Sequence, residues 1–98
     1  MIYLDNNATT PVDPAALQAM LPFFEDHFAN PSGAYAASRT CAKAITTARE
    51  QVATLLGCTD SEVVFTSGGT ESDITALHSA THSFPERKHI VTLSLIHI

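Results

Sequence analysis

Cysteine, basic residues and long apolar runs are all scarce in this sequence. Five Lys and Arg against ten Asp and Glu give a formal net charge of −5. A chain with this balance has no basic surface to attract nucleic acid or an anionic membrane, so neither is expected as a partner. The two cysteines are too few for a disulfide framework, which favours a reducing compartment. We therefore expect a cytoplasmic protein.

The N-terminus lacks the features of a targeting segment. No basic stretch precedes the short apolar run at residues 1–4, and no later run is long enough to span a membrane. The chain is nevertheless 45% apolar and 15% charged, so it carries the material for a core. A chain of 98 residues buries a modest share of its surface, and we expect marginal stability in isolation.

Apolar periodicity and turn formers predict alternating strands and helices. Short strands are predicted where β-branched and aromatic residues cluster, at residues 2–4, 62–66 and 89–93. Helices are predicted where apolar residues recur every three or four positions, at residues 14–24, 34–56 and 71–82. The order strand, turn, helix, strand in the second half is that of a right-handed parallel βαβ unit, so we predict an α/β fold.

Capping and breaking residues place the helix ends. Asp13 is a good N-cap before Pro14, and Pro22 is expected to kink or restart the first helix because it lacks an amide hydrogen. Gly57 is a suitable terminator for the long helix. The hydroxyl of Thr70 is predicted to cap the last helix, which we expect to end before Pro85.

Residues 67–70 (SGGT) are typical of a phosphate site, since they join a predicted buried strand to a helix N-terminus. Glycines let the backbone approach an anion, and the amides and dipole of the first helical turn attract it. Ser67, Thr70 or Ser72 offers a further hydroxyl donor. The segment matches neither the Walker nor the dinucleotide pattern. A glycine turn that only caps the helix, without a ligand, is the alternative.

Four landmarks of the sequence resemble cysteine desulfurases of the class V aminotransferase family, in order and at suitable spacing. They are residues 2–12 (IYLDNNATTPV), 30–32 (NPS), 48–57 (AREQVATLLG) and 65–72 (FTSGGTES). The resemblance covers residues 1–92 and implies fold type I of the pyridoxal-phosphate enzymes. The chain is then the N-terminal portion of a large domain built as a mostly parallel sheet wrapped by helices, in an enzyme that is a homodimer.

The same resemblance implies the site residues. Gly69 and Thr70 match the pair that binds the phosphate of pyridoxal 5'-phosphate, in agreement with the helix N-terminus argument. The substrate-pocket candidates, which match segments near the active site, are Asn7, Ala8, Thr9 and Asn30. For the two asparagines the alternative is a turn side chain that bonds its own backbone.

Three positions depart from the family pattern. Tyr35 stands where the family often has His, and Ser38 where it often has Gly, so the subgroup stays open. Gly69 stands where many members have Ala, a change that keeps the backbone amide available for phosphate.

The activity that the resemblance implies is conversion of L-cysteine to L-alanine, with sulfur held as an enzyme persulfide. A sulfur-acceptor or scaffold protein would then receive it for iron–sulfur cluster or thio-cofactor assembly. Such chemistry needs a Schiff-base lysine and a thiolate. Neither Lys43 nor Lys88 resembles the family's lysine motif, and neither Cys41 nor Cys58 matches its persulfide cysteine. We assign no catalytic residue and expect this chain to be inactive as it stands.

Two other functions stay open. A selenocysteine lyase or an aminotransferase of the same family is one, because the residues that choose the substrate lie outside these landmarks. A small non-catalytic phosphate-binding domain is the other. A metal protein is not expected, because His78 and His82 have helical spacing but lack the glutamate of a zincin motif and an evident third ligand.

Residues 93–98 (LSLIHI) break the family pattern that precedes them. We hypothesise that they are a non-native tail translated from a sequencing adaptor, so that the family domain ends at residue 92. The alternative is a buried strand that ends a divergent protein.

Overall fold

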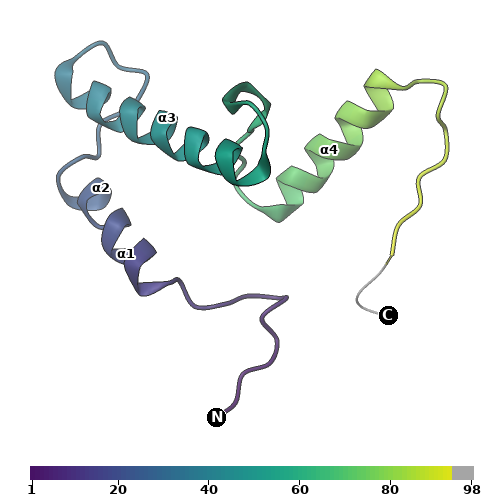
Figure 1. The fold of residues 1–98 in the computed structure, drawn as a ribbon, viewed down its shortest axis with the longest axis horizontal. Coiled ribbons are helices and arrows are strands. Elements are labelled where there is room, and N and C mark those ends of the chain that lie inside the picture. Colours follow the sequence, from purple (N-terminus) through teal and green to yellow (C-terminus); the bar gives the residue numbers. More distant parts are fainter. Residues whose placement is uncertain (94–98) are drawn as a thin grey trace. The chain divides into compact units, whose positions relative to one another are not determined.

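The computed structural model describes residues 1–93 and is helical (Figure 1). The elements, in chain order, are α1 (Pro14–Met20), α2 (Pro22–Glu25), α3 (Ala36–Leu56), the short 3-10 helix η1 (Asp60–Glu62) and α4 (Gly69–Ser83). Two compact units make up the chain, one formed by Met1–Val63 and the other beginning at Val64.

The first predicted helix forms as two short helices, α1 and α2, separated at Pro22 as expected. The carboxylate of Asp13 caps α1 by accepting from the amides of Ala15 (2.7 Å) and Ala16 (3.4 Å). Leu21 still has a right-handed helical backbone between the two elements. The break therefore comes from the amide hydrogen that Pro22 lacks rather than from a change of chain direction.

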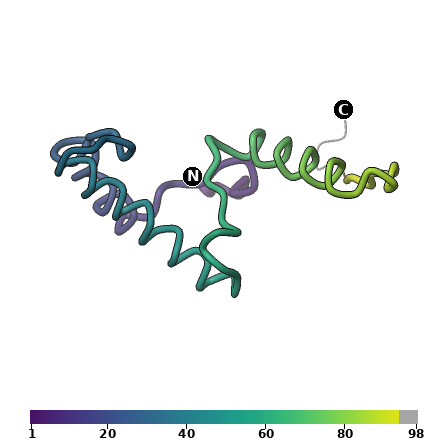
Figure 2. Tube along the Cα trace, turned by 90° about the horizontal axis from the view of Figure 1, so that it is seen from above, coloured from purple at the N-terminus to yellow at the C-terminus, as the bar shows by residue number. Residues whose placement is uncertain are grey.

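The long predicted helix is confirmed as α3, which runs unbroken for 21 residues (Figure 2). It ends at Gly57, whose φ of 71° is the left-handed conformation that favours glycine. The amide of Cys58 then donates to the carbonyl of Ala53 at 3.0 Å, which satisfies an orphan carbonyl of the last turn. The helix end is thus fixed by its own backbone.

The core of the first unit lies along α3. Its buried apolar side chains are Cys41, Ala53 and Val63. The thiol of Cys41 donates to the carbonyl of His27 at 3.0 Å, and the guanidinium of Arg49 donates to the carbonyl of Val63. These bonds attach the segments before and after α3 to the helix. Cys41 is thus a core residue of the first unit.

The last predicted helix is present as α4 but begins at Gly69, two residues earlier than expected. Its N-cap is Gly68, which has no side chain to cap with, so the prediction that the Thr70 hydroxyl caps the helix is wrong. The reason is the extended backbone of Gly68 (φ 164°), which lets the chain enter the helix at once and places Thr70 inside the first turn. The helix ends before Phe84, as Pro85 predicted.

The three predicted strands are not confirmed, because residues 1–93 contain no strand. Val63 has an extended backbone (φ −91°, ψ 122°), so this residue adopts the conformation that the predicted strand would have. Glu62, expected at the start of that strand, belongs to η1 instead, where its carboxylate accepts from the amide of Thr59 at 2.8 Å. A strand also needs a neighbouring strand that pairs with its backbone groups, and residues 1–93 contain no such strand. The helices of the predicted α/β fold are present without its sheet.

No helix within residues 1–93 combines the length and the apolar composition needed to cross a membrane. The hypothesis of a non-native tail concerns residues 93–98, of which all but Leu93 lie outside the described part of the chain.

Candidate functional site

The turn at residues 67–70 leads into a helix whose first backbone amides have no partner within the helix. The first i→i−4 hydrogen bond of α4 runs from the amide of Ser72 to the carbonyl of Gly68, at 3.1 Å. The amides of Gly69, Thr70 and Glu71 precede this bond and therefore have no partner within the helix. A Cβ built on Gly68 or Gly69 would meet no atom within 4 Å, so the backbone is open to a ligand here.

The hydroxyls of the turn are not equally available. The Ser72 hydroxyl lies 2.5 Å from the Thr66 hydroxyl and donates to the carbonyl of Gly68 at 3.1 Å. The Ser67 hydroxyl donates to the carboxylate of Glu71. Within residues 1–93 the hydroxyl of Thr70 makes no hydrogen bond, and the side chain is exposed. Of the three hydroxyls that the sequence offered, that of Thr70 is left for a ligand.

Glu71 is a residue of this turn that sequence reasoning missed. Its carboxylate accepts hydrogen bonds from the Ser67 hydroxyl and from the Ser67 amide, the latter at 2.7 Å. The side-chain bond first, and the backbone bond second, lower the pKa of Glu71 from its ordinary value. The sequence did contain a signal for this role, since Glu71 follows a serine at the start of a helix by four positions. In a capping box the acidic residue follows the serine by three positions.

These features fit a phosphate group. The amides of Gly69 and Thr70 and the Thr70 hydroxyl are the donors that a phosphate oxygen needs, and the glycines leave space for it. Residues 64–84 contain no Lys or Arg, so within this segment the amides and the helix dipole are the groups that would attract a phosphate. The assignment of Gly69 and Thr70 as phosphate ligands stays a prediction.

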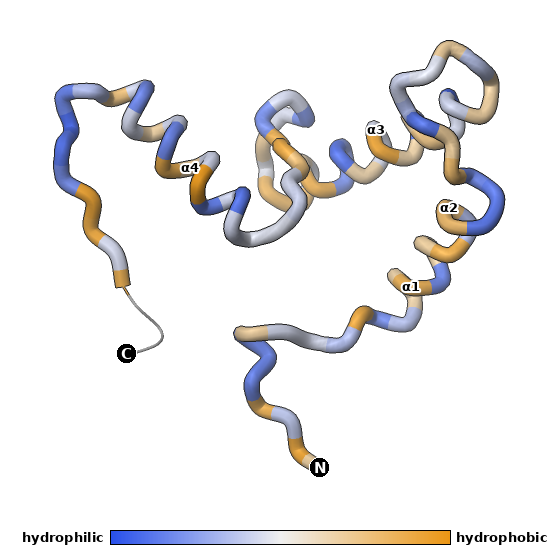
Figure 3. The backbone as a smooth tube through the Cα atoms, turned by 180° about the vertical axis from the view of Figure 1, so that it is seen from behind, coloured by the Kyte–Doolittle hydropathy of each residue, from blue (hydrophilic) through white to orange (hydrophobic). Residues whose placement is uncertain are grey.

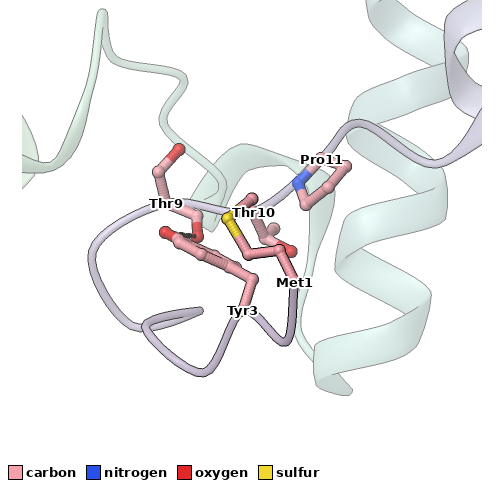
Figure 4. Close-up of a pocket in the computed structure, with 5 residues that line it drawn as sticks. All are labelled: Met1, Tyr3, Thr9, Thr10 and Pro11. Carbon is pink, nitrogen blue, oxygen red and sulfur yellow. Dashed lines mark hydrogen bonds between the residues drawn. The ribbon is translucent and has the colours of Figure 1, made fainter.

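A second candidate segment, residues 3–10, closes on itself near the N-terminus (Figure 4). The carbonyl of Asp5 accepts from the amide of Ala8 (3.1 Å), the amide of Thr9 (3.4 Å) and the hydroxyl of Tyr3 (2.9 Å). The Thr10 hydroxyl donates to the side-chain oxygen of Asn6 at 3.0 Å. The substrate-pocket candidates Ala8 and Thr9 therefore belong to one hydrogen-bonded loop.

The two candidate asparagines differ in what their side chains do. Asn30 follows the alternative interpretation, because its side-chain oxygen accepts from the amide of Ser32 at 2.9 Å and forms an Asx turn between α2 and α3. Asn7 does not: in the part of the chain that the structure describes, its side chain makes no hydrogen bond and is exposed. The side-chain amide of Asn7 is therefore available to a ligand, whereas the side-chain oxygen of Asn30 is already hydrogen-bonded to the amide of Ser32.

Other reactive groups do not gather into a site. Among residues 1–93 no three His, Cys, Asp or Glu side chains are arranged to hold a metal ion. Cys41 is buried and Cys58 is half-buried, and both are free thiols. Lys43 is exposed on α3.

Comparison with known proteins gives a consistent result over almost the whole chain. The family described as "Aminotransferase class-V" matches residues 2–97. A cysteine desulfurase of Trichormus azollae is 50% identical over 97 residues, which are 99% of this chain and 24% of the relative. The cysteine desulfurase NifS of Azotobacter vinelandii is 50% identical over 97 residues, 98% of this chain and 24% of NifS.

A third relative, a cysteine desulfurase of Cereibacter sphaeroides, is 52% identical over 97 residues, 98% of this chain and 25% of the relative. The chain thus spans about a quarter of the length of the curated relatives it matches. No solved structure matches it significantly.

Proposed function

Since this chain belongs to the aminotransferase class-V family, we propose that it is the N-terminal part of a pyridoxal-phosphate-dependent cysteine desulfurase. The whole enzyme converts L-cysteine to L-alanine and passes the sulfur, held as an enzyme persulfide, to an acceptor or scaffold protein. Iron–sulfur cluster or thio-cofactor assembly is the use we propose for this sulfur. The enzyme acts as a homodimer in the cytoplasm.

The observation that carries the proposal is the start of α4. There the unpaired amides of Gly69 and Thr70 and the uncommitted Thr70 hydroxyl meet beside glycines that leave the backbone open. These groups hold the cofactor phosphate and orient the cofactor. When bound, pyridoxal phosphate supplies an electron sink for bond cleavage at the substrate's α-carbon.

The other residues of this chain have supporting roles. Asn7, Ala8 and Thr9 contribute to the substrate pocket through the loop described above, and Asn30 shapes the turn between α2 and α3. We assign the persulfide to no cysteine of this chain. Cys41 is 6% exposed and its thiol is bonded to a backbone carbonyl, so it is shielded from a substrate.

A hybrid enzyme tests the proposal. This chain would replace the 97-residue matched segment of the Azotobacter vinelandii NifS, and alanine formation from L-cysteine would be measured together with cofactor content. We expect the hybrid to bind the cofactor and to form alanine. Thr70→Ala is expected to weaken cofactor affinity about tenfold, since a hydrogen bond to a charged group is lost.

The matched control is Thr81→Ala, which removes a hydroxyl from the same helix. That hydroxyl donates to the carbonyl of Leu77 at 2.9 Å, so its loss should leave cofactor affinity unchanged. A folded hybrid that holds no cofactor contradicts the phosphate site. A hybrid that holds the cofactor and forms no alanine contradicts the desulfurase function.

A further inference from the structure

The proposed function assigns no role to the hydroxyl of Tyr3. It lies 2.9 Å from the carbonyl oxygen of Asp5 and 2.9 Å from the carbonyl oxygen of Thr9. A phenol has one hydrogen, so the hydroxyl shares it between the two carbonyls. The side chain therefore bridges the two ends of a five-residue segment.

The bridged segment, residues 5–9, is held by neighbouring residues alone. The carbonyl of Asp5 receives the amides of Ala8 and Thr9 as well as the Tyr3 hydroxyl, and these three donors fix its direction. The carbonyl of Thr9, at the other end, is fixed by Tyr3. Without the hydroxyl, the bonds that remain are the turn bonds to Asp5, of which the Thr9 bond is long at 3.4 Å, and the bond from the Thr10 hydroxyl to the side chain of Asn6.

The two asparagines of this segment differ in what their side chains do. Asn6 accepts from the Thr10 hydroxyl at 3.0 Å and is committed to the loop. Asn7 is exposed and makes no hydrogen bond within residues 1–93. A free carboxamide both donates and accepts, so it can bind the carboxylate or the ammonium group of an amino acid.

We propose that Tyr3 is a positioning residue for substrate binding: its hydroxyl holds residues 5–9 in the loop that presents Asn7 to the amino-acid substrate. The inference rests on the proposed function, because it takes the substrate to be L-cysteine. Tyr3 touches neither substrate nor cofactor and acts through the loop.

The ring of Tyr3 and its hydroxyl have separable roles. The ring lines an apolar hollow of about 400 Å³ together with Met1, Thr9, Thr10 and Pro11 (Figure 4). Tyr3→Phe keeps this apolar wall and removes the bridging donor alone. The matched control is Tyr35→Phe, since within residues 1–93 the exposed hydroxyl of Tyr35 makes no hydrogen bond.

Amide hydrogen exchange in the NifS hybrid tests the bridge itself. Tyr3→Phe is expected to raise the exchange rates of Ala8 and Thr9 by about threefold or more, because one net hydrogen bond stabilising the loop is lost. Tyr35→Phe should leave both rates unchanged. Equal rates in the Tyr3→Phe and wild-type chains, or the same increase in the control, would overturn the bridge.

Steady-state kinetics of the NifS hybrid test the positioning role. Tyr3→Phe is expected to raise the KM for L-cysteine about three- to tenfold, with kcat and the absorbance of the bound cofactor unchanged. Tyr35→Phe should change none of these quantities. An active hybrid whose KM does not respond to Tyr3→Phe overturns the positioning role alone. A loss of cofactor in Tyr3→Phe points to general damage and overturns it too.

The proposed function fails differently. If the unmodified hybrid forms no alanine, the substrate assignment is wrong and the positioning role falls with it. The exchange rates of Ala8 and Thr9 then still decide whether Tyr3 bridges the loop.

Discussion

At the start of α4 a carboxylate of the chain itself competes for anion-binding donors. Glu71 takes the amide and the hydroxyl of Ser67 and places its negative charge near the positive end of the helix dipole. Within residues 1–93 the amides of Gly69 and Thr70 are not involved in these bonds. Glu71 therefore stabilises the helix start without occupying the amides of Gly69 and Thr70.

The pKa of Glu71 tests this arrangement. Its hydrogen bonds to Ser67 hold the pKa below the ordinary value of 4.5, so Ser67→Ala should raise it toward that value. NMR titration of the side-chain carboxyl measures the change. Glu62, whose pKa is lowered by the amide and hydroxyl of Thr59, serves as an internal control that Ser67→Ala should not affect.

The sign of the pH dependence follows from the direction of the shift. A carboxyl whose pKa is lower in the folded chain contributes stability above its unfolded pKa, and this contribution is lost as pH falls through the folded pKa. The helix start at Gly69 should therefore weaken as the solution is acidified below pH 4.5, and weaken less in Ser67→Ala. A Glu71 pKa that does not respond to Ser67→Ala would contradict the account.

The sequence could identify the candidate asparagines of the site, but it could not show which of them has a side chain available to a ligand. Asn7 and Asn30 were equivalent as turn-forming asparagines next to motifs, and the difference arises from loop conformation. In the loop of Asn30 the amide of Ser32 points back at the side chain, whereas in the loop of Asn7 the neighbouring amides are taken by the carbonyl of Asp5. Such choices depend on backbone geometry that residue types do not specify.

Among the elements, the break between α1 and α2 has the simplest physical cause. The amide of Leu21 donates to Leu17 at 3.2 Å and the amide of Glu25 donates to Leu21 at 3.3 Å, so helical bonding continues on both sides of Pro22. The i→i−4 bonds are interrupted at Pro22, which has no amide hydrogen, and the amide of Phe24 bonds three residues back, to Leu21 at 3.0 Å. The helical backbone of Leu21 shows that the two elements are one interrupted helix.

Pro22→Ala should therefore fuse α1 and α2. The alanine restores an amide donor and removes the ring that crowds the preceding turn, so far-ultraviolet circular dichroism should show more helix than in the original chain. Pro31→Ala, a matched change in the loop between α2 and α3, should leave the helical signal unchanged. An unchanged signal in Pro22→Ala would mean that the break has another cause.

Helices were predictable from this sequence and strands were not, for one reason. The bonds of a helix are local, so Asp13, Pro22 and Gly57 suffice to place its ends. A strand is completed by a neighbour that can be far away in the sequence. Residues 62–66 carry the composition of a strand, yet residues 1–93 contain no second strand to pair with them. The β-propensity of this segment is therefore seen in the extended backbone of Val63, but no sheet forms within residues 1–93.

At the scale of the whole molecule, large apolar side chains are exposed on each of the helices α1 to α4. Figure 3 colours the backbone orange where the residues are hydrophobic. Within residues 1–93, α4 has no buried residue, and three apolar side chains are buried in the first unit. Burial of apolar side chains must offset the conformational entropy that the chain loses on folding. So small a core offsets little of this entropy, which is why the decisive test uses the NifS hybrid.

Family membership was the part of the whole-molecule description that the sequence predicted best. Four ordered landmarks indicated the class V aminotransferases, and the family match over residues 2–97 confirms it. The proposed dimer, the lysine and the persulfide cysteine are features of a whole enzyme, whereas this chain spans about a quarter of its relatives. They stay predictions.

The central claim is that the backbone at the start of α4 holds the cofactor phosphate, and a pair of substitutions at Gly69 isolates it. Proline is well tolerated at the first position of a helix but has no amide to donate, whereas alanine keeps the amide. The measurement is the dissociation constant of pyridoxal 5'-phosphate from the NifS hybrid carrying Gly69→Pro or Gly69→Ala.

We predict that Gly69→Ala leaves the dissociation constant within about twofold of the unsubstituted hybrid, because the donor remains. Gly69→Pro should raise it about tenfold or more, the loss of one hydrogen bond to a charged group. Equal dissociation constants for the two folded variants would contradict the phosphate site at this turn.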